Sequence, residues 1–526
     1  EKDVTEGVAD LVFSNGKLQI VRKKEQEIGG KLLSYDENTI EIEGYGRVSH
    51  TGKIPVYELL EGEDVTESSI SKVVLGNMEV SYVIGEEEVC AILIRTPAVI
   101  ENIRVLLLAD DGGKFRSAVY LKADTDARIR FGGNESDYAA GTLLDVSTWF
   151  TECNDTFSIQ PVTENGKIFL CDEVGNTISN GYPGSAEVRR YEEGYTVVNS
   201  VPFETYLTAV VPSEMPSTYE KEALKAQAVC ARSYAYIQLM RADLAAFGAH
   251  INDSTSYQVY NKAEAGEASR QAVEETKHEV MTYADEVIGA YYFSTSMGYT
   301  DTAEVWNPEE MDHYGYLKKV CLNTPETDLD LSDEKTFSDY IRTPQTGFDS
   351  EIKYYRWTAQ ADFHGKEDEI RQILENRHSI SPRNVIYYES DGKNETDSMA
   401  DFGMLEGIEV EKRSTSGSIL TLRLSYEHGM VKVFSEYNIR KVMGLGVTNI
   451  TYQDGSESTG GTILPCAAVS LVKEADNVYT LYGGGYGHGL GMSQNGANGL
   501  AKTGMTYKDI LNFFYKDISI TSLAEK

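Results

Sequence analysis

Short strand-like segments fill the first 190 residues, and no long helical stripe precedes Pro216. Apolar and polar residues alternate in segments such as 78–85 (MEVSYVIG) and 88–94 (EVCAILI), and Asn, Asp and Gly residues separate these segments. An alternation of period two bounded by turn residues is typical of half-buried strands joined by hairpins. We therefore expect two β-rich units, a small barrel or sandwich over residues 1–97 and a second unit over residues 98–190.

The first long helix is predicted after Pro216. Ser217 and Glu220 have the spacing of a capping box, which satisfies backbone donors at a helix start. The apolar positions behind them fall on one helical face and form a buried stripe: Leu224, Ala228, Ala231, Ala235 and Leu239. We expect a helix from Thr218 to about Phe247.

A mixed α/β domain is expected over residues 191–522, which makes the fold class α+β. Strand patterns return at 439–443 (IRKVM) and 418–424 (SILTLRL), and two short helices are predicted over about 493–502 and 506–515. Residues 325–351 carry eight acids and two bases without periodicity, so we expect a solvated excursion there.

The charge balance excludes some partners. With 48 Lys and Arg against 83 Asp and Glu, the formal charge is −35, so phosphate backbones would be repelled and no nucleic-acid partner is expected. No apolar run approaches the roughly 18 residues that span a bilayer. The start at Glu1 is typical of a mature or trimmed chain whose leader or anchor has been removed. Cys153 and Cys171 could form a disulfide across a hairpin, or all six cysteines could be free thiols.

One acid stands in an informative place. Glu214 follows an apolar run that ends at Val211 and precedes the predicted helix, so we expect it in a turn near the helix N-terminus. The helix dipole there favours the carboxylate, whereas burial favours the neutral acid. A solvated loop carboxylate is the plain alternative. The edges of the following helix carry polar side chains that either cover the core with their stems or face a sugar cleft: Lys225, Gln227, Arg232 and Tyr234.

Two further segments place polar groups in apolar or glycine-rich surroundings. Residues 256–260 and 290–296 mix aromatics with hydroxyls and an amide, a composition that suits a carbohydrate and equally a β-strand. In residues 483–491 (GGGYGHGLG), six of nine residues are glycine. This loop has neither the spacing of a phosphate-binding loop nor that of a dinucleotide fingerprint. It presents His488 just before a helix, where the ring is either a functional group or an ordinary structural histidine.

Several of these motifs together resemble the SpoIID/LytB family, which includes a sporulation lytic transglycosylase and amidase-enhancer proteins. The matching stretches follow in order: VNSVPFETYLTAVVPSEMP, EALKAQAVCARSYA, DSTSYQVY, YFSTSMGYT and GGGYGHGLGMSQNGANGLAKTGMTYKDILNFFY, which together span residues 195–515. Weaker similarity extends upstream, and the first hundred residues lie outside the resemblance.

The resemblance implies cleavage of peptidoglycan glycan strands between N-acetylmuramic acid and N-acetylglucosamine, with formation of a 1,6-anhydro ring. It implies that Glu214 is the catalytic acid and base. One carboxyl suffices for this chemistry because the sugar's own O6 replaces water as nucleophile. The residues expected to line the glycan groove are Lys225, Gln227, Arg232, Tyr234, Gln258, Tyr260, Ser294, Thr295, Ser296, His488, Ser493 and Gln494.

This sequence departs from the family at a zinc site that some members carry. The corresponding positions hold Asn252, Ser256, Tyr257 and Phe293, so no zinc and no other cofactor is expected. That pattern is closer to the LytB-type members, and it keeps two alternatives open: a non-catalytic wall-binding or amidase-enhancing protein, or a surface protein that has lost the cleft. The expected partners are glycan strands and a cell-wall amidase or sporulation-complex protein, and the expected location is extracytoplasmic, secreted or anchored at the wall.

Overall fold

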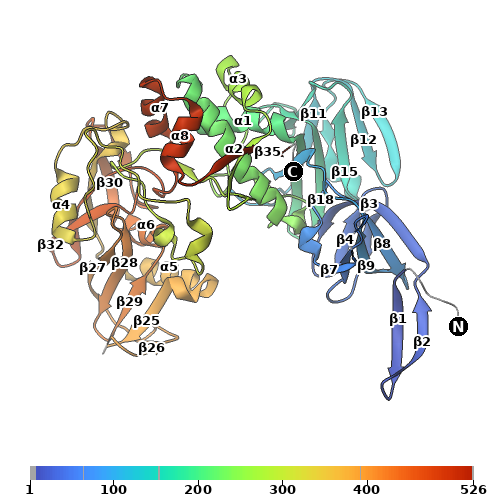
Figure 1. The fold of residues 1–526 in the computed structure, drawn as a ribbon, viewed down its shortest axis with the longest axis horizontal. Helices are drawn as coiled ribbons and strands as arrows, with labels where there is room; N and C mark the ends of the chain where they lie inside the picture. The colour runs from blue at the N-terminus through green and yellow to red at the C-terminus, as the bar shows by residue number, and fades with distance from the viewer. Residues whose placement is uncertain (1–6, 63, 152–154, 391, 524–526) are drawn as a thin grey trace. The chain divides into compact units, whose positions relative to one another are not determined.

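The chain forms two compact units. The computed structural model describes residues 7–62, 64–151, 155–390 and 392–523. Unit 1 comprises Glu1–Ser217 and Tyr234–Lys277, and unit 2 comprises Thr218–Ser233 and His278–Lys526. Both units combine helices with sheets (Figure 1), which confirms the expected α+β fold class. The predicted domain boundaries at residues 97 and 190 stay predictions.

Unit 1 begins with a β-hairpin and a small closed sheet. The hairpin turns at Asn15-Gly16, where both residues have positive φ, as a two-residue hairpin turn requires. The next sheet has the order β5-β4-β3-β8-β9-β6-β7, and an additional pairing of β5 with β9 closes five of its strands into a ring. The strands of this part are β1 (Ala9–Ser14), β2 (Lys17–Lys23), β3 (Gln26–Tyr35), β4 (Thr39–Ile42), β5 (Gly46–Ser49), β6 (Val56–Glu58), β7 (Thr66–Ser68), β8 (Glu79–Gly85) and β9 (Glu88–Ile94).

A larger sheet with two helices completes unit 1. Its order is β13-β12-β15-β18-β19-β10-β20, and a four-stranded sheet of order β14-β11-β16-β17 accompanies it. Helix α1 (Phe203–Glu214) follows β19 directly and packs on α3 (Glu267–Glu275). The strands are β10 (Asn102–Leu106), β11 (Tyr120–Ala123), β12 (Ala127–Phe131), β13 (Asn134–Tyr138), β14 (Leu144–Asp145), β15 (Phe157–Pro161), β16 (Lys167–Cys171), β17 (Tyr182–Pro183), β18 (Ser185–Tyr191), β19 (Gly194–Pro202) and β20 (Ile251–Asn252).

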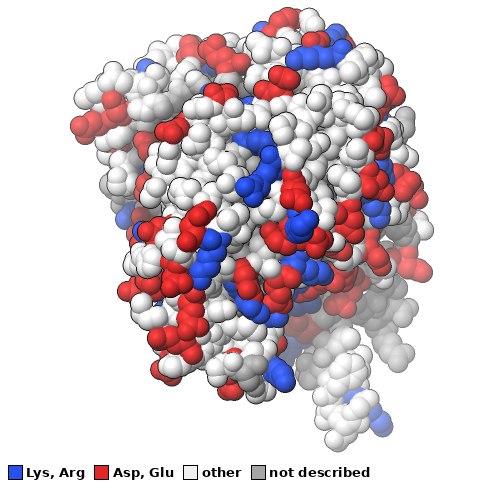
Figure 2. All heavy atoms as spheres, turned by 90° about the vertical axis from the view of Figure 1, so that its left-hand side faces the viewer, with Lys and Arg blue, Asp and Glu red and all other residues white. Residues whose placement is uncertain are grey.

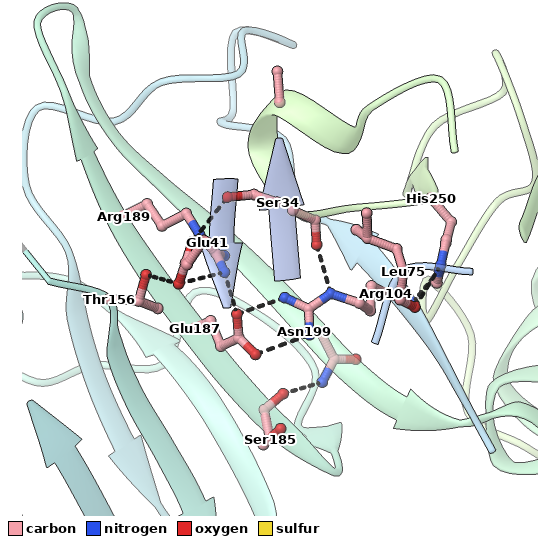
Figure 3. Close-up of polar contacts among 12 residues, drawn as sticks. Ser34, Glu41, Leu75, Arg104, Thr156, Ser185, Glu187, Arg189, Asn199 and His250 are labelled. Carbon is pink, nitrogen blue, oxygen red and sulfur yellow. Dashed lines mark hydrogen bonds and ion pairs between the residues drawn. The ribbon is translucent and has the colours of Figure 1, made fainter. Parts of the chain in front are cut away.

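A buried ion-pair network connects the two sheets of unit 1. Arg189 on β18 donates to Glu41 on β4 at 2.8 Å and to Glu187 at 2.6 Å. Glu187 also accepts two hydrogen bonds from Arg104 on β10, and all four side chains are buried (Figure 3). Buried charges need such pairing because their desolvation is expensive. The network therefore fixes β4 of the closed sheet against β10 and β18.

Two five-stranded antiparallel sheets form the main core of unit 2. Their orders are β31-β30-β24-β33-β32 and β26-β25-β29-β28-β27, and alternate residues such as Trp357, Ala359 and Ala361 of β24 point into the shared core. The strands are β24 (Trp357–Asp362), β25 (Val385–Glu389), β26 (Glu395–Thr396), β27 (Leu405–Arg413), β28 (Ile419–Tyr426), β29 (Gly429–Val433), β30 (Val447–Tyr452), β31 (Glu457–Thr459), β32 (Val469–Ala475) and β33 (Val478–Gly483).

Smaller elements of unit 2 position the segments of interest. Strands β21 (Glu279–Tyr283), β22 (Glu286–Val287) and β35 (Ser519–Ser522) form one sheet, and β23 (Tyr292–Phe293) pairs in parallel with β34 (Met492–Ser493). The helices are α4 (Glu334–Arg342), α5 (Glu367–Ile380), α6 (Glu436–Gly444), α7 (Gln494–Lys502) and α8 (Tyr507–Phe514). Helix α2 (Lys221–Arg241) belongs to unit 2 as far as Ser233 and to unit 1 from Tyr234 onward.

The structure confirms some predicted elements and corrects others. The two C-terminal helices are confirmed, with Ser493 and Thr506 as N-caps, and so is the strand at 418–424, which is β28. The long helix begins at Lys221 and ends at Arg241, so the capping box was wrong: the Ser217 hydroxyl is 2.8 Å from that of Ser269. Residues 439–443 lie in helix α6 and not in a strand.

The acidic segment 325–351 was also misread in part. It contains α4, whose N-cap Asp333 accepts a hydrogen bond from the Thr336 N–H. Phe337, Tyr340 and Ile341 are buried on one face of this helix, at the i, i+3, i+4 spacing. The acids occupy the solvated face, so a count of charged residues does not reveal this short apolar stripe.

Membrane-spanning helices, surface charge and the predicted disulfide complete the description. In the part of the chain that the structure describes, we find no helix that is both long and apolar enough to cross a membrane. On the face drawn in Figure 2, Lys and Arg side chains are scattered among acidic ones. Cys171 is buried, and its predicted partner Cys153 lies outside the described residues, so that disulfide stays a prediction.

Candidate functional site

Glu214 is the last residue of helix α1, and not a turn residue at the start of the next helix as expected. The dipole at this end of a helix is negative, which is the opposite of the expected sign. The Oε1 atom of Glu214 accepts a hydrogen bond from the Val259 N–H at 2.6 Å, and the side chain is half-buried. The neighbouring Ser213 hydroxyl accepts from the Lys262 N–H at 3.0 Å. The segment around residues 259–262 thus holds the end of α1 in place.

A buried layer of tyrosine and amide side chains lies close to Glu214 in unit 1. The Tyr206 hydroxyl donates to Gln258 Oε1 at 3.0 Å, and the Tyr260 hydroxyl donates to Asn199 Oδ1 at 2.8 Å. Burial raises the pKa of both phenols well above 10, and the charge of Glu214 adds to this effect at Tyr206. Both hydroxyls therefore remain protonated donors. Of the predicted site residues, unit 1 contains Glu214, Tyr234, Gln258 and Tyr260.

A second cluster forms in unit 2 where two distant segments pair. Because β23 lies beside β34, residues 294–296 lie next to the start of α7. The Asn495 side-chain amide donates to the Ser294 carbonyl and to the Thr295 hydroxyl, each at 3.0 Å, and the Ser294 and Thr295 hydroxyls are 3.1 Å apart. Tyr219 completes the cluster by donating to Asn495 Oδ1.

Asp349 supports this cluster through buried hydrogen bonds, although the sequence did not predict it as a site residue. Its carboxylate accepts from the Ser296 N–H at 2.8 Å, from the Ser296 hydroxyl at 3.0 Å and from the Ser493 hydroxyl at 2.8 Å. Burial raises the pKa of this carboxyl, and the three hydrogen bonds oppose that effect. Ser296 and Ser493 are themselves buried, so they orient their neighbours. Asp349 was hidden among the eight acids of segment 325–351.

His488 lies in a well-defined environment within the glycine-rich loop. Its Nδ1 accepts from the Leu490 N–H at 3.1 Å, so a proton of the neutral ring resides on Nε2. The ring centroid lies 5.7 Å from those of Phe293 and Trp306. Desolvation lowers the pKa of His488 to about 4, which makes the ring neutral at pH 7. Neutral His488 therefore has an N–H donor at Nε2 and is no cation.

Three of the four predicted residues on helix α2 belong to unit 2 and contact other residues of that unit. Lys225 pairs with Glu222 at 2.8 Å, and its ammonium is 5.5 Å from the centre of the Tyr507 ring. Gln227 Oε1 accepts from Gln494 Nε2 at 3.4 Å. Arg232 is fully buried and donates to the Glu279 carbonyl at 3.1 Å. Direct contact of these side chains with a glycan stays a prediction.

The residues at the family's zinc positions do not fit a zinc ion. The side-chain oxygen of Asn252 accepts hydrogen bonds from the Ser254 N–H at 3.0 Å and from the Ser254 hydroxyl at 2.7 Å. The Phe293 side chain is a hydrocarbon, and Ser256 and Tyr257 supply only hydroxyl groups, whereas zinc prefers thiolate, imidazole and carboxylate ligands. Across residues 7–523, leaving out the undescribed positions, no three His, Cys, Asp or Glu side chains gather as a metal site would require.

Comparisons with known proteins find similarity to sporulation and amidase-enhancer proteins of bacteria. A family model described as stage II sporulation protein matches residues 191–283, and a model described as a domain of unknown function matches residues 300–491. The amidase enhancer of Bacillus subtilis is 28% identical over 323 residues, which cover 60% of this chain and 40% of that protein. Stage II sporulation protein D of Bacillus subtilis is 26% identical over 350 residues, 63% of this chain and 78% of the relative.

An uncharacterized protein of Brachyspira hyodysenteriae is 27% identical over 343 residues, which cover 64% of this chain and 72% of the relative. The model match at 191–283 contains Glu214, the buried layer of tyrosine and amide side chains close to it and the whole of helix α2. Of the second cluster, Ser294, Thr295 and Asn495 lie outside that match, and Tyr219 lies inside it.

Proposed function

We propose, from the premise that this chain belongs to the SpoIID/LytB family, that it is a lytic transglycosylase of peptidoglycan glycan strands. One observation supports this best: the Glu214 carboxyl is fixed by the Val259 N–H at 2.6 Å beside the buried Tyr206 and Gln258 side chains. A fixed, half-buried carboxyl next to protonated phenols is suited to move a proton to and from a sugar.

In the proposed reaction Glu214 acts twice. The neutral acid first gives its proton to the glycosidic oxygen, and the bond between that oxygen and C1 of the muramoyl residue breaks as an oxocarbenium-like centre develops. The carboxylate then accepts the proton of the muramoyl O6 hydroxyl while O6 forms a new bond to C1. The 1,6-anhydro ring closes, Glu214 is again protonated, and no water is consumed.

The proposed setting follows from the same relatives. The chain would act outside the cytoplasm at the cell wall, and we propose that the reaction uses no metal because the side chains at the family's zinc positions are poor zinc ligands. Cleavage in the presence of EDTA should then equal cleavage without it. A loss of activity restored by zinc would refute this part.

The deciding experiment uses peptide-free glycan strands and mass spectrometry of the products. The wild-type protein should release fragments with 1,6-anhydro ends, and Glu214→Gln should release none. Glu204→Gln changes another acid of helix α1 and serves as the matched control, with product formation expected at the wild-type level. No product from the wild type, or equal product from Glu214→Gln, would contradict the proposal.

A second candidate function is enhancement of a cell-wall amidase, favoured by the relative that carries that name. The aligned part covers only 40% of that protein, so both its partner and its activity are proposals for this chain. This alternative predicts that a wall amidase releases stem peptides faster when the protein is added, and that Glu214→Gln accelerates it as well as the wild type does. An unchanged amidase rate would exclude it.

A further inference from the structure

The glycine-rich loop of unit 2 holds one aromatic ring rigidly at the surface. Tyr486 lies between Gly485 and Gly487, whose φ angles are +85° and +117°, and its side chain is 42% exposed. The Tyr486 N–H donates to the Thr295 carbonyl at 2.8 Å, and the Thr295 N–H donates back to the Tyr486 carbonyl at 3.2 Å. The backbone that carries this exposed ring is therefore held by hydrogen bonds in both directions.

The neighbouring glycines are required for this presentation. A Cβ atom at Gly485 would lie 3.0 Å from the Thr295 carbonyl oxygen, and one at Gly487 would lie 2.7 Å from Phe293 Cβ. The Gly485 N–H donates to the Tyr354 carbonyl at 3.0 Å, and the Gly487 N–H donates to the Pro465 carbonyl at 2.9 Å. The loop is therefore a pre-organised support, since its conformation needs no further ordering when a ligand binds.

A stack of aromatic rings supports Tyr486 from behind. The Tyr354 ring lies 4.5 Å from the Tyr486 ring between centroids, with 41° between the planes, and Tyr452 contacts Tyr354 edge-on at 5.1 Å. The Lys353 ammonium lies 4.9 Å from the Tyr354 ring centre and 5.2 Å from that of Tyr452. Such pairs resist displacement of the ring that they cover.

We propose that Tyr486 is the stacking platform of a sugar-binding subsite, on which the apolar face of an N-acetylated hexose ring lies while its rim reaches the half-buried Ser294 hydroxyl. Sugar rings have one face of C–H groups and a rim of hydroxyls, so they match a rigid exposed ring beside hydroxyl and amide groups. Ser294 is only partly buried and supplies a hydroxyl beside Thr295, whose backbone pairs with that of Tyr486. The buried Thr295 and Asn495 side chains hydrogen-bond to Ser294 and hold it in place. This inference rests on the proposed function for the class of ligand and adds the residue that binds it.

The test measures binding separately from cleavage. All variants are made in the full chain with Glu214→Gln, and calorimetry with chitohexaose and with peptide-free glycan strands gives the Kd. Tyr486→Leu fills a similar volume without a ring and should weaken binding about ten-fold for both probes. Tyr486→Phe and Tyr486→Trp keep the ring and should bind within about two-fold of the parent.

Tyr437 on helix α6 provides a matched control because its side chain is 41% exposed and also belongs to unit 2. Tyr437→Leu should leave the Kd unchanged. Equal binding by Tyr486→Leu and the parent, equal weakening by Tyr486→Phe and Tyr486→Leu, or no binding of either probe by the parent would each overturn the inference. If Tyr486→Leu does not fold, a loss of binding in Tyr486→Phe or Tyr486→Trp, which both keep a ring, would still overturn the inference.

The outcomes also separate this inference from the proposed function. Binding that depends on Tyr486, together with no 1,6-anhydro product from a protein with intact Glu214, would refute transglycosylase activity and retain the subsite. Cleavage that depends on Glu214, together with binding that Tyr486→Leu does not change, would support transglycosylase activity and refute the subsite.

Discussion

Glu41→Gln should destabilise unit 1 strongly at neutral pH and much less in acid. Glu41 accepts from Arg189 Nε at 2.8 Å and from the Ser34 hydroxyl at 2.9 Å, inside the network of Figure 3. Burial is the largest single effect and opposes its ionisation. The Arg189 charge and the hydrogen bonds to the carboxylate together outweigh burial and lower the pKa of Glu41 to about 2, against an ordinary value of 4.5. The variant keeps the shape and removes the charge, which leaves Arg189 with Glu187 as its remaining acid.

The pKa difference sets the size and the sign of the effect. The pKa is lowered by about 2.5 units, and at 1.36 kcal/mol per unit the charged form contributes about 3 kcal/mol to the free energy of unfolding at pH 7. Because the folded-state pKa is the lower one, this contribution is present above pH 4.5 and is lost as the pH falls toward 2. At pH 3.5 about 2 kcal/mol should remain.

Urea unfolding, monitored by hydrogen exchange in peptides from β18, measures this change in the free energy of unfolding of unit 1. Glu135→Gln is the control, since Glu135 makes exposed ion pairs with Arg128 and Arg130 in the same unit and should change nothing measurable. Equal destabilisation by the two substitutions would refute the assignment. A loss for Glu41→Gln that stays constant between pH 7 and pH 3.5 would also refute it, because a packing defect does not titrate.

Two further titrations concern unit 2. Burial raises the pKa of Asp301 from 3.8 to about 6, so unit 2 should lose stability as the pH rises from 4 to 6. In urea unfolding of unit 2, Asp301→Asn should be about 3 kcal/mol more stable than the wild type at pH 7 and no more stable at pH 3.5. A variant that is less stable than the wild type at pH 7 would contradict this. His488 should show no change in its ring C–H chemical shifts between pH 8 and pH 5.5, because its pKa is about 4. A midpoint near 6.5 in NMR, assigned by its loss in His488→Gln, would contradict this.

Local patterns predicted the elements whose signals are contained in a few neighbouring residues. Helix α8 starts at Tyr507 because Thr506 and Asp509 form a capping box, and helix α7 starts after the N-cap Ser493. The strand predicted at residues 439–443 (IRKVM) was wrong because five positions are too few to tell a strand period from a helix period. The apolar face of α6 becomes visible only when Ile439, Val442 and Met443 are seen to be buried together.

Helix α1 shows why propensity misleads near the candidate site. Its sequence is rich in Val, Thr and Tyr and contains Pro212, all of which argue against a helix. Pro212 lies in the last turn, where only one backbone hydrogen bond is lost, and the packing of α1 against α3 and β19 compensates. The consequence for function is direct: Glu214 belongs to a rigid helix end and not to a loop.

The support of the candidate site could not be predicted because its partners are far apart in sequence. Asp349 contacts Ser296 and Ser493, which are separated from it by 53 and 144 residues, and only the parallel pairing of β23 with β34 brings them together. The glycine-rich loop, in contrast, could be recognised from its composition, because six glycines in nine residues indicate close backbone approach. What the sequence could not indicate is that these glycines serve to fix Tyr486 outward, because a rigid presentation and a flexible loop have the same composition and differ only in whether the backbone N–H groups have partners.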